Sequence, residues 1–107
     1  MFITVPLVLM LAAAPVTDAV GAGRKAFGQC LSSQIQPSLD KKLTLSDFQA
    51  AIKKTCADKE AAFRAAIVAD DKASKMSDAD AQSDADDQVA EYVDKITAEY
   101  DDYNKPG

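Results

Sequence analysis

The stretch TLSDFQAAIKKTCADKEAAFRAAI, residues 44–67, begins with a strong helix start signal. Thr44 has the side chain of a good N-cap residue, and Asp47 stands three residues later, as the acidic partner does in a capping box. No glycine or proline interrupts the residues that follow. The pattern predicts one continuous helix over residues 44–68.

One apolar face of this helix includes a cysteine, Cys56, which lies in phase with Ile52 and Phe63. A metal site, a catalytic thiol or a disulfide would each account for it. The chain contains two cysteines and no histidine, which removes Cys-His catalysis and histidine-based metal sites. Because the other cysteine, Cys30, is too distant for a Cys-x-x-Cys motif, the sequence favours a Cys30–Cys56 disulfide.

The residues before this stretch predict a second helix, over residues 22–36. Phe27, Cys30, Leu31 and Ile35 share one of its faces, and Pro37 disfavours helical backbone at the residue before it. An antiparallel pair of helices 22–36 and 44–68 would bring the two sulfurs to the same level. A disulfide closing a loop of about 27 residues should stabilise a domain this small by about 3.5 kcal/mol.

A third helix is predicted over residues 84–103, and no segment alternates as a half-buried strand does. Its apolar residues form a narrow seam, typical of a helix in a bundle, which is also a possible partner-binding surface: Val89, Val93, Ile96, Tyr100 and Tyr103. The predicted fold is all-α, a disulfide-stapled antiparallel helical hairpin plus this third amphipathic helix, in one domain over residues 20–107.

The acidic residues 69–82 are predicted as a frayed helix end, a turn or a mobile linker, with Ser77 or Ser83 capping the helix that follows. A calcium-binding loop starting at Asp78 would place Ser83 where an EF-hand needs glycine, and Val89 where it needs glutamate. We therefore expect no metal site and no cofactor.

Residues 1–19 are predicted as a signal peptide, because an uncharged apolar run is followed by small residues two apart, Thr17 and Ala19. Cleavage is expected after Ala19, with Ala22 as the alternative. A retained membrane anchor is the competing interpretation, but the run is shorter than the roughly 18 apolar residues that such an anchor needs. The expected location is the periplasm or the secreted fraction, without stable membrane insertion after cleavage.

The formal net charge is −5, and it is unevenly distributed. Residues 20–64 contain eight Lys or Arg against four Asp or Glu, and residues 65–107 contain four against twelve. No concentrated basic patch exists to bind nucleic acid. The two halves are instead expected to attract each other, with the aspartates facing Lys41, Lys42, Lys53 and Lys54, so that acid would loosen the third helix.

The segments AFGQCL, residues 26–31, and AAIKKTCADKEAAFRAAI, residues 50–67, resemble small exported helical proteins of Gram-negative bacteria that carry one disulfide. Within the second segment, CADKEAAFR, residues 56–64, is similar to the stretch after the second cysteine in HdeA-type periplasmic acid-stress chaperones. That resemblance covers nine residues and implies a small, helical, stress-related protein.

These observations predict a non-catalytic interaction or stress-related module. Its expected partner is another protein, or a second copy of the chain, bound through the seam of the third helix. The alternatives are a structural or accessory envelope protein, and an enzyme that uses carboxylates or tyrosines. No catalytic residue is assigned.

Overall fold

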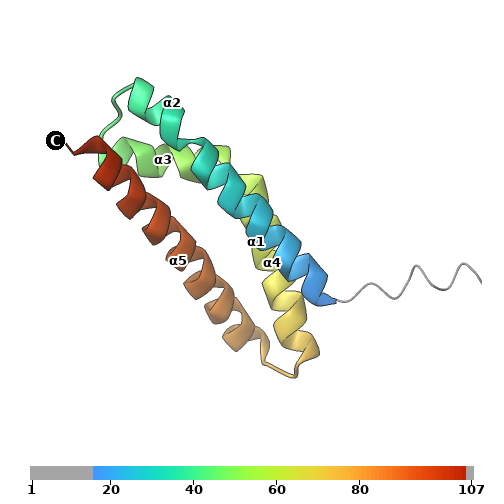
Figure 1. The fold of residues 1–107 in the computed structure, drawn as a ribbon. Coiled ribbons are helices and arrows are strands. Elements are labelled where there is room, and N and C mark those ends of the chain that lie inside the picture. Colours follow the sequence, from blue (N-terminus) through green and yellow to red (C-terminus); the bar gives the residue numbers. More distant parts are fainter. Residues whose placement is uncertain (1–15, 106–107) are drawn as a thin grey trace, which may run out of the picture.

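The computed structural model describes residues 16–105, and within this range the chain is helical without strands. The predicted all-α class is confirmed (Figure 1). The elements follow in chain order: α1 (Val16–Ser33), α2 (Ile35–Asp40), α3 (Leu45–Thr55), α4 (Ala57–Ala73) and α5 (Asp78–Asn104). The first fifteen residues of the predicted signal peptide lie outside the described range.

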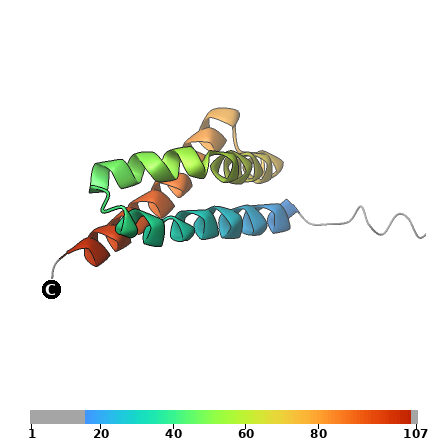
Figure 2. The same cartoon turned by 90° about the horizontal axis from the view of Figure 1, so that it is seen from above.

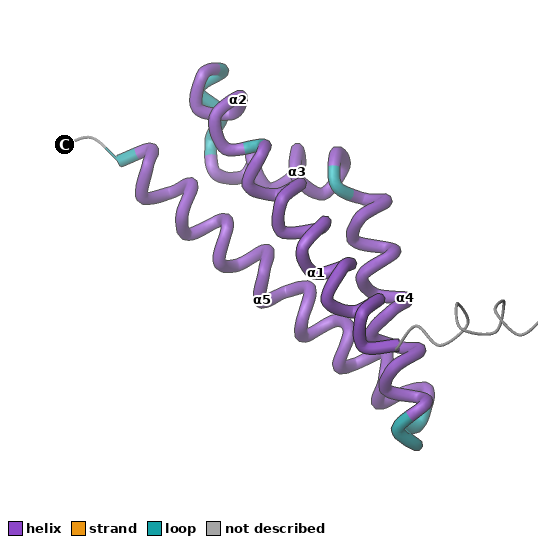
Figure 3. Tube along the Cα trace, turned by 45° about the vertical axis from the view of Figure 1, so that its right-hand side comes forward, coloured by secondary structure: helices purple, strands orange, loops and turns teal. Residues whose placement is uncertain are grey.

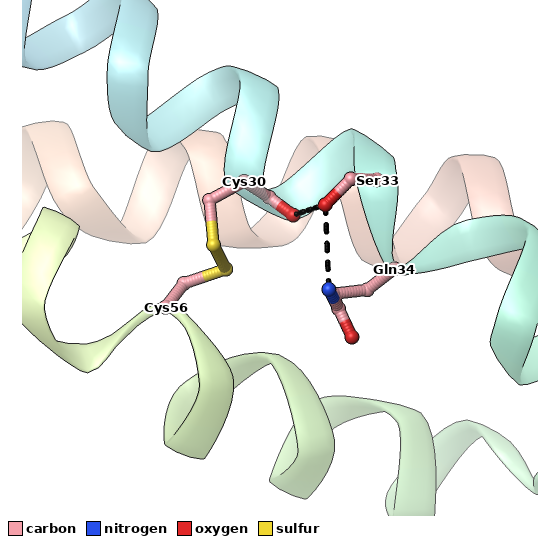
Figure 4. The surroundings of a disulfide bond; sticks show 4 residues. All are labelled: Cys30, Ser33, Gln34 and Cys56. Atoms are coloured by element: carbon pink, nitrogen blue, oxygen red, sulfur yellow. Dashed lines mark hydrogen bonds between the residues drawn. A yellow bond between two sulfur atoms is a disulfide. The ribbon is translucent and has the colours of Figure 1, made fainter.

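The disulfide between Cys30 and Cys56 is confirmed, with the two Cα atoms 5.8 Å apart. It joins α1 to the start of α4, and the two helices run antiparallel as the predicted hairpin requires (Figure 4). Beside it, the Ser33 hydroxyl donates to the Cys30 carbonyl at 2.7 Å and accepts from the Gln34 amide at 3.3 Å. These hydrogen bonds lie at the boundary between α1 and α2.

The predicted continuous helix over 44–68 is wrong, because the helix bends at Cys56 and becomes α3 and α4. Cys56 has φ −101° and ψ 15°, outside helical geometry. The bend is clear from above, where α3 lies across the view and α4 is seen nearly end-on (Figure 2). No glycine or proline marks this position. The bend instead coincides with the residue that the disulfide holds against α1.

The predicted helix over 22–36 is longer in the structure and ends differently. It starts at Val16, so cleavage after Ala19 would remove its first four residues. It ends at Ser33 rather than at Gln36, and Pro37 lies in the first turn of α2. Proline is tolerated there because the backbone N–H groups of a first turn have no helical partner.

Of the alternatives for residues 69–82, a mobile linker is wrong, because most of the segment is helical, whereas a helix end and a turn are present. Helix α4 continues to Ala73 and α5 begins at Asp78, six residues before the predicted start. The turn between them is a Schellman motif in which the backbone N–H of Met76 bonds to the Asp71 carbonyl at 3.0 Å. Lys75 takes the positive φ of 74° that glycine usually adopts in this motif.

Both helix caps are visible at the atomic level. Ser77 accepts from the backbone N–H of Asp80 at 3.1 Å, and Thr44 accepts from that of Asp47 at the same distance. Asp78 and Asp80 then occupy the first turn of α5, where the positive end of the helix dipole favours carboxylates. Asp78 and Asp80, which the sequence analysis placed before the third helix, therefore form its first turn.

The core lies between α1, α3, α4 and α5, and its largest fully buried side chains are aromatic. Phe27 and Phe63 pack with ring centroids 5.9 Å apart, and Tyr92 meets Phe63 edge-on. Helix α4 is the centre of this arrangement, with α1 and α5 packed along it. On α5, the fully buried Ala81 and Ala85 allow close approach to α4 near the turn.

Candidate functional site

The predicted seam of the third helix is divided between core and surface. Val89, Ile96 and Tyr100 are buried in the core, and Val93 is half-buried against it. Tyr103 is different, since 60% of its surface is exposed. Three of the five seam residues are therefore occupied by packing within the chain, and a partner reaches them only if α5 moves.

Tyr100 is the most heavily used member of the seam. Its ring stacks on Phe48 with centroids 4.0 Å apart and planes 5° from parallel. Its hydroxyl donates toward the turn between α2 and α3, 2.8 Å from the Leu43 carbonyl and 3.2 Å from the Ser38 carbonyl. One side chain thus fastens the C-terminal part of α5 to α3 and to the end of α2.

Two hollows on the surface between α1–α2 and α5 form a groove. Figure 3 shows the course of these helices. The two adjoining hollows, of about 250 Å³ and 390 Å³, share Ser32 and Glu99. We call this feature the α1–α5 groove. One wall is formed by Gly28, Leu31, Ser32, Ile35, Gln36 and Leu39, and the other by Tyr92, Lys95, Ile96, Glu99 and Tyr103.

Gly28 lies in this groove, and no contact within the fold requires glycine at this position. A Cβ atom added there would meet nothing within 4 Å, whereas one added at Gly23 would lie 3.1 Å from the backbone Cα of Phe63. Gly23 is thus required for the close approach of α1 to α4. Gly28 allows no such close approach, yet it lowers the stability of the helix by about 0.5–1 kcal/mol relative to alanine.

Alanine substitutions should separate these two glycines. Gly28→Ala is expected to raise the free energy of unfolding by about 0.5–1 kcal/mol. Gly23→Ala should give no gain, because its contact with the Phe63 backbone costs as much as the helix gains, or more. Urea unfolding of both variants measures the difference. Equal gains at the two positions would contradict the packing described for Gly23.

A separate hollow of about 230 Å³, outside the α1–α5 groove, lies where α1, α3, α4 and α5 meet. Phe27, Leu31, Ile52 and Val93 form its apolar walls, and Lys53 and Glu60 are among the polar residues that line it. It is smaller than the roughly 300–1,000 Å³ of ordinary small-molecule sites. Both parts of the α1–α5 groove are larger and more open than this hollow.

The chemistry available to the chain is limited. Both cysteines are consumed by the disulfide, and the sequence has no histidine. Across residues 16–105, no group of three potential ligands among Cys, Asp and Glu is placed to hold a metal ion. Over the same part of the chain, no helix has the length and apolarity needed to cross a membrane.

The acidic half of the chain does not pair with the lysines expected from the sequence. Asp86 on α5 forms an ion pair with Arg64 on α4, which also binds Glu60, and Asp78 pairs with Lys72 at 3.4 Å. None of the lysines at positions 41, 42, 53 and 54 forms an ion pair within the described residues. The ion pairs between helices therefore join α4 to α5, through Arg64–Asp86 and Lys72–Asp78.

Two carboxyl groups face each other across that hairpin, Asp71 on α4 and Asp84 on α5. Gln88 donates to Asp84 Oδ2 at 3.1 Å, whereas the buried Asp71 Oδ2 has no donor of its own among the described residues. Two ionised carboxylates can only accept, so a hydrogen bond between them requires a proton. The hydrogen bond with Asp84, then burial, and the charges of Asp84 and Asp70 raise the pKa of Asp71 above its ordinary value of 3.8.

Because the raised pKa means that the folded state binds this proton more tightly, the Asp71–Asp84 pair stabilises the fold in acid. Its contribution is complete below the ordinary value of 3.8 and is lost as the pH rises through the raised pKa. The expectation that acid loosens the third helix thus did not include the stabilisation that protonation of this pair gives in acid. At this position we expect protonation to favour the contact between α4 and α5.

Asp71→Asn should therefore be more stable than the unchanged chain at neutral pH, because the amide donates to Asp84 without needing a proton. The advantage should disappear in acid. Urea-unfolding midpoints measured from about pH 3 to about pH 7 test this, with Asp94→Asn on the exposed face of α5 as control. An Asp71→Asn variant that is destabilised at every pH would contradict the shared proton.

No known protein family, curated protein or solved structure matches this chain. The similarity to exported one-disulfide proteins stays a prediction. The disulfide itself indicates an oxidising compartment outside the cytoplasm, because such bonds are rare where thiols are kept reduced.

Proposed function

We propose that this protein is a non-catalytic interaction module of the periplasm or the secreted fraction, and that its partner binds in the α1–α5 groove. The observation that carries the proposal is the groove itself: its lining is more apolar than polar, its α1 wall contains Gly28, and Tyr103 lies exposed at its end. An exposed apolar hollow flanked by polar edges is typical of interaction sites.

The disulfide supports the exported location, and so does the apolar N-terminal run that resembles a signal peptide. If residues 1–19 are removed on export, the intact mass of protein recovered from the periplasm should correspond to a chain that begins at Val20, or at Gly23 for the alternative site. Recovery of the full chain in a membrane fraction would contradict cleavage and favour an anchor.

Site-specific photo-crosslinking in the exporting cell tests the binding function. A photoreactive amino acid is placed at Ser32 or Glu99 in the groove, and at Lys59 or Ala61 on the exposed face of α4 as matched controls. We expect discrete adducts from the two groove positions, lost when Gly28→Leu fills the groove, and no such adducts from the controls. Equal adducts at all four positions, or none at any, would refute binding in this groove.

A further inference from the structure

We propose that Asp71 and Asp84 form a pH-dependent latch at the turn end of the α4–α5 hairpin. When the two carboxyl groups share a proton, the end of α4 and the start of α5 stay in contact. When both groups are ionised, these two helix ends separate. The inference concerns a local change of conformation and does not depend on the α1–α5 groove.

The two carboxyl groups lie in the contact between the helices. Asp71 Oδ2 is buried and has no hydrogen-bond donor among the described residues, although the carboxyl group of Asp84 faces it. A buried oxygen without a donor costs free energy unless a proton joins it to the facing oxygen. The closed contact is therefore satisfied when the pair holds one proton, and is unsatisfied when it holds none.

The charges around the pair oppose its full ionisation. Residues 70–84 contain five aspartates and two lysines. The charges that act on Asp71 are those of Asp84 and Asp70, and both are negative. Helix α1 also packs along α4, but no cation on α1 shifts the pKa of Asp71. The charged residues of α1 are Asp18, Arg24 and Lys25.

The apolar packing at this end of α5 is light. Ala81 and Ala85 are the residues of α5 that are fully buried here, and each contributes one methyl group. The opposite end of α5 is held by the Tyr100 ring, which stacks on Phe48. Because two methyl groups bury much less area than an aromatic ring, repulsion between two carboxylates opens the turn end more easily than the far end.

Two ion pairs flank the latch and limit how far the hairpin opens. Lys72 and Asp78, 3.4 Å apart, join the helices beside the turn, and Arg64 and Asp86 join them further along α4. Both side chains of the first pair are more than half exposed, so this pair contributes little. The opening therefore extends from the turn as far as Arg64, and residues 78–85 are the part of α5 that moves.

The direction of the pH dependence follows from the closed contact. The hydrogen bond with Asp84 is the largest of the causes that raise the pKa of Asp71 above its ordinary value of 3.8. The closed state therefore holds the proton more tightly than the open state, and opening becomes more favourable as the pH rises through the raised pKa. One linked proton changes the opening equilibrium by at most about tenfold per pH unit.

Distances between spin labels on the exported protein test the latch. A nitroxide-carrying amino acid is placed at two exposed positions of the turn end, Ala73 and Ser83, and in a second sample at Ala61 and Glu91 as the reference pair. Pulsed electron paramagnetic resonance from about pH 3 to about pH 7 gives the distance distributions. The ratio of long to short distances between 73 and 83 should rise with pH, by up to about tenfold per pH unit, and the reference distance should stay constant.

Three variants separate the latch from the general charge of the hairpin. Asp71→Asn should keep the short distance at every pH, because the amide donates to Asp84 without a proton. Asp84→Asn should do the same from the other helix. Asp80→Asn is the matched control, since it removes an exposed aspartate that does not act on Asp71, and it should retain the pH dependence. Circular dichroism checks that each variant is folded.

A single short distance between 73 and 83 at every pH would overturn the inference, because the two carboxyl groups would then part by side-chain rotation alone. A pH dependence that persists in Asp71→Asn would overturn it as well, since other groups would then be responsible. An equal change in the reference pair would show that the whole hairpin responds to pH, and would reject a latch at its turn end.

Discussion

Protein in which both cysteines are replaced, by Cys30→Ser with Cys56→Ser, should unfold with a free energy about 3.5 kcal/mol lower than the native chain. The bond closes a loop with a sequence separation of 26 and removes that loop's freedom from the unfolded state. For a domain of this size such a loss is a large part of the total stability. Urea unfolding of the oxidised chain, the reduced chain and the double variant provides the measurement.

The disulfide lies at a bend in the chain, which adds to its expected effect on stability. Cys56 is fully buried at the bend between α3 and α4, so the disulfide sets the level of that bend against α1. Cys30→Ala with Cys56→Ala is the matched control for the polarity of serine in the buried position. If either double variant unfolded at the same urea concentration as the oxidised chain, the staple would contribute nothing and the hairpin would be held by packing alone.

Local signals in the sequence predicted the parts of the fold that local physics decides. The hydroxyl of Thr44 caps α3 as expected, and the two cysteines meet because helix lengths and apolar phase bring them level. The apolar periodicity of the third helix placed Val89, Ile96 and Tyr100 on one face, and that face is buried. These features depend on residues close together or on a single helical period.

Other features escaped because tertiary contacts override local preference. The bend at Cys56 follows no breaker residue, and the turn at 74–77 uses Lys75 in a conformation that usually indicates glycine. The α1–α5 groove and the Asp71–Asp84 pair each combine residues from separate helices. Only the unexplained Gly28, in the middle of a helix, was a sequence signal that pointed toward the groove.

Tyr100→Ala should have the largest single-residue effect, a loss of about 3–5 kcal/mol in the free energy of unfolding. The substitution removes a fully buried ring stacked on Phe48 together with a hydroxyl that donates toward Leu43. Tyr100→Phe keeps the ring and should lose only about 1 kcal/mol. The difference between the two variants assigns the energy to packing or to the hydrogen bond.

Tyr103→Ala is the matched control, one helical turn further along α5. Its ring is 60% exposed, so the substitution should change stability by less than about 0.5 kcal/mol. It lines the α1–α5 groove, however, so the crosslinks formed from Ser32 and Glu99 should weaken. In Tyr100→Ala, hydrogen exchange should show that the C-terminal part of α5 opens first, because its anchor to α3 is gone.

The pair therefore distinguishes a packed helix from a recognition surface. If Tyr100→Ala left stability unchanged while reducing the groove crosslinks, Tyr100 would belong to an interface and the buried arrangement described for it would be wrong. If Tyr103→Ala destabilised the chain as much as Tyr100→Ala, the end of α5 would be packing rather than binding. We expect stability to be lost in Tyr100→Ala and groove crosslinks to be lost in Tyr103→Ala, because the groove exists only while Tyr100 holds α5 in place.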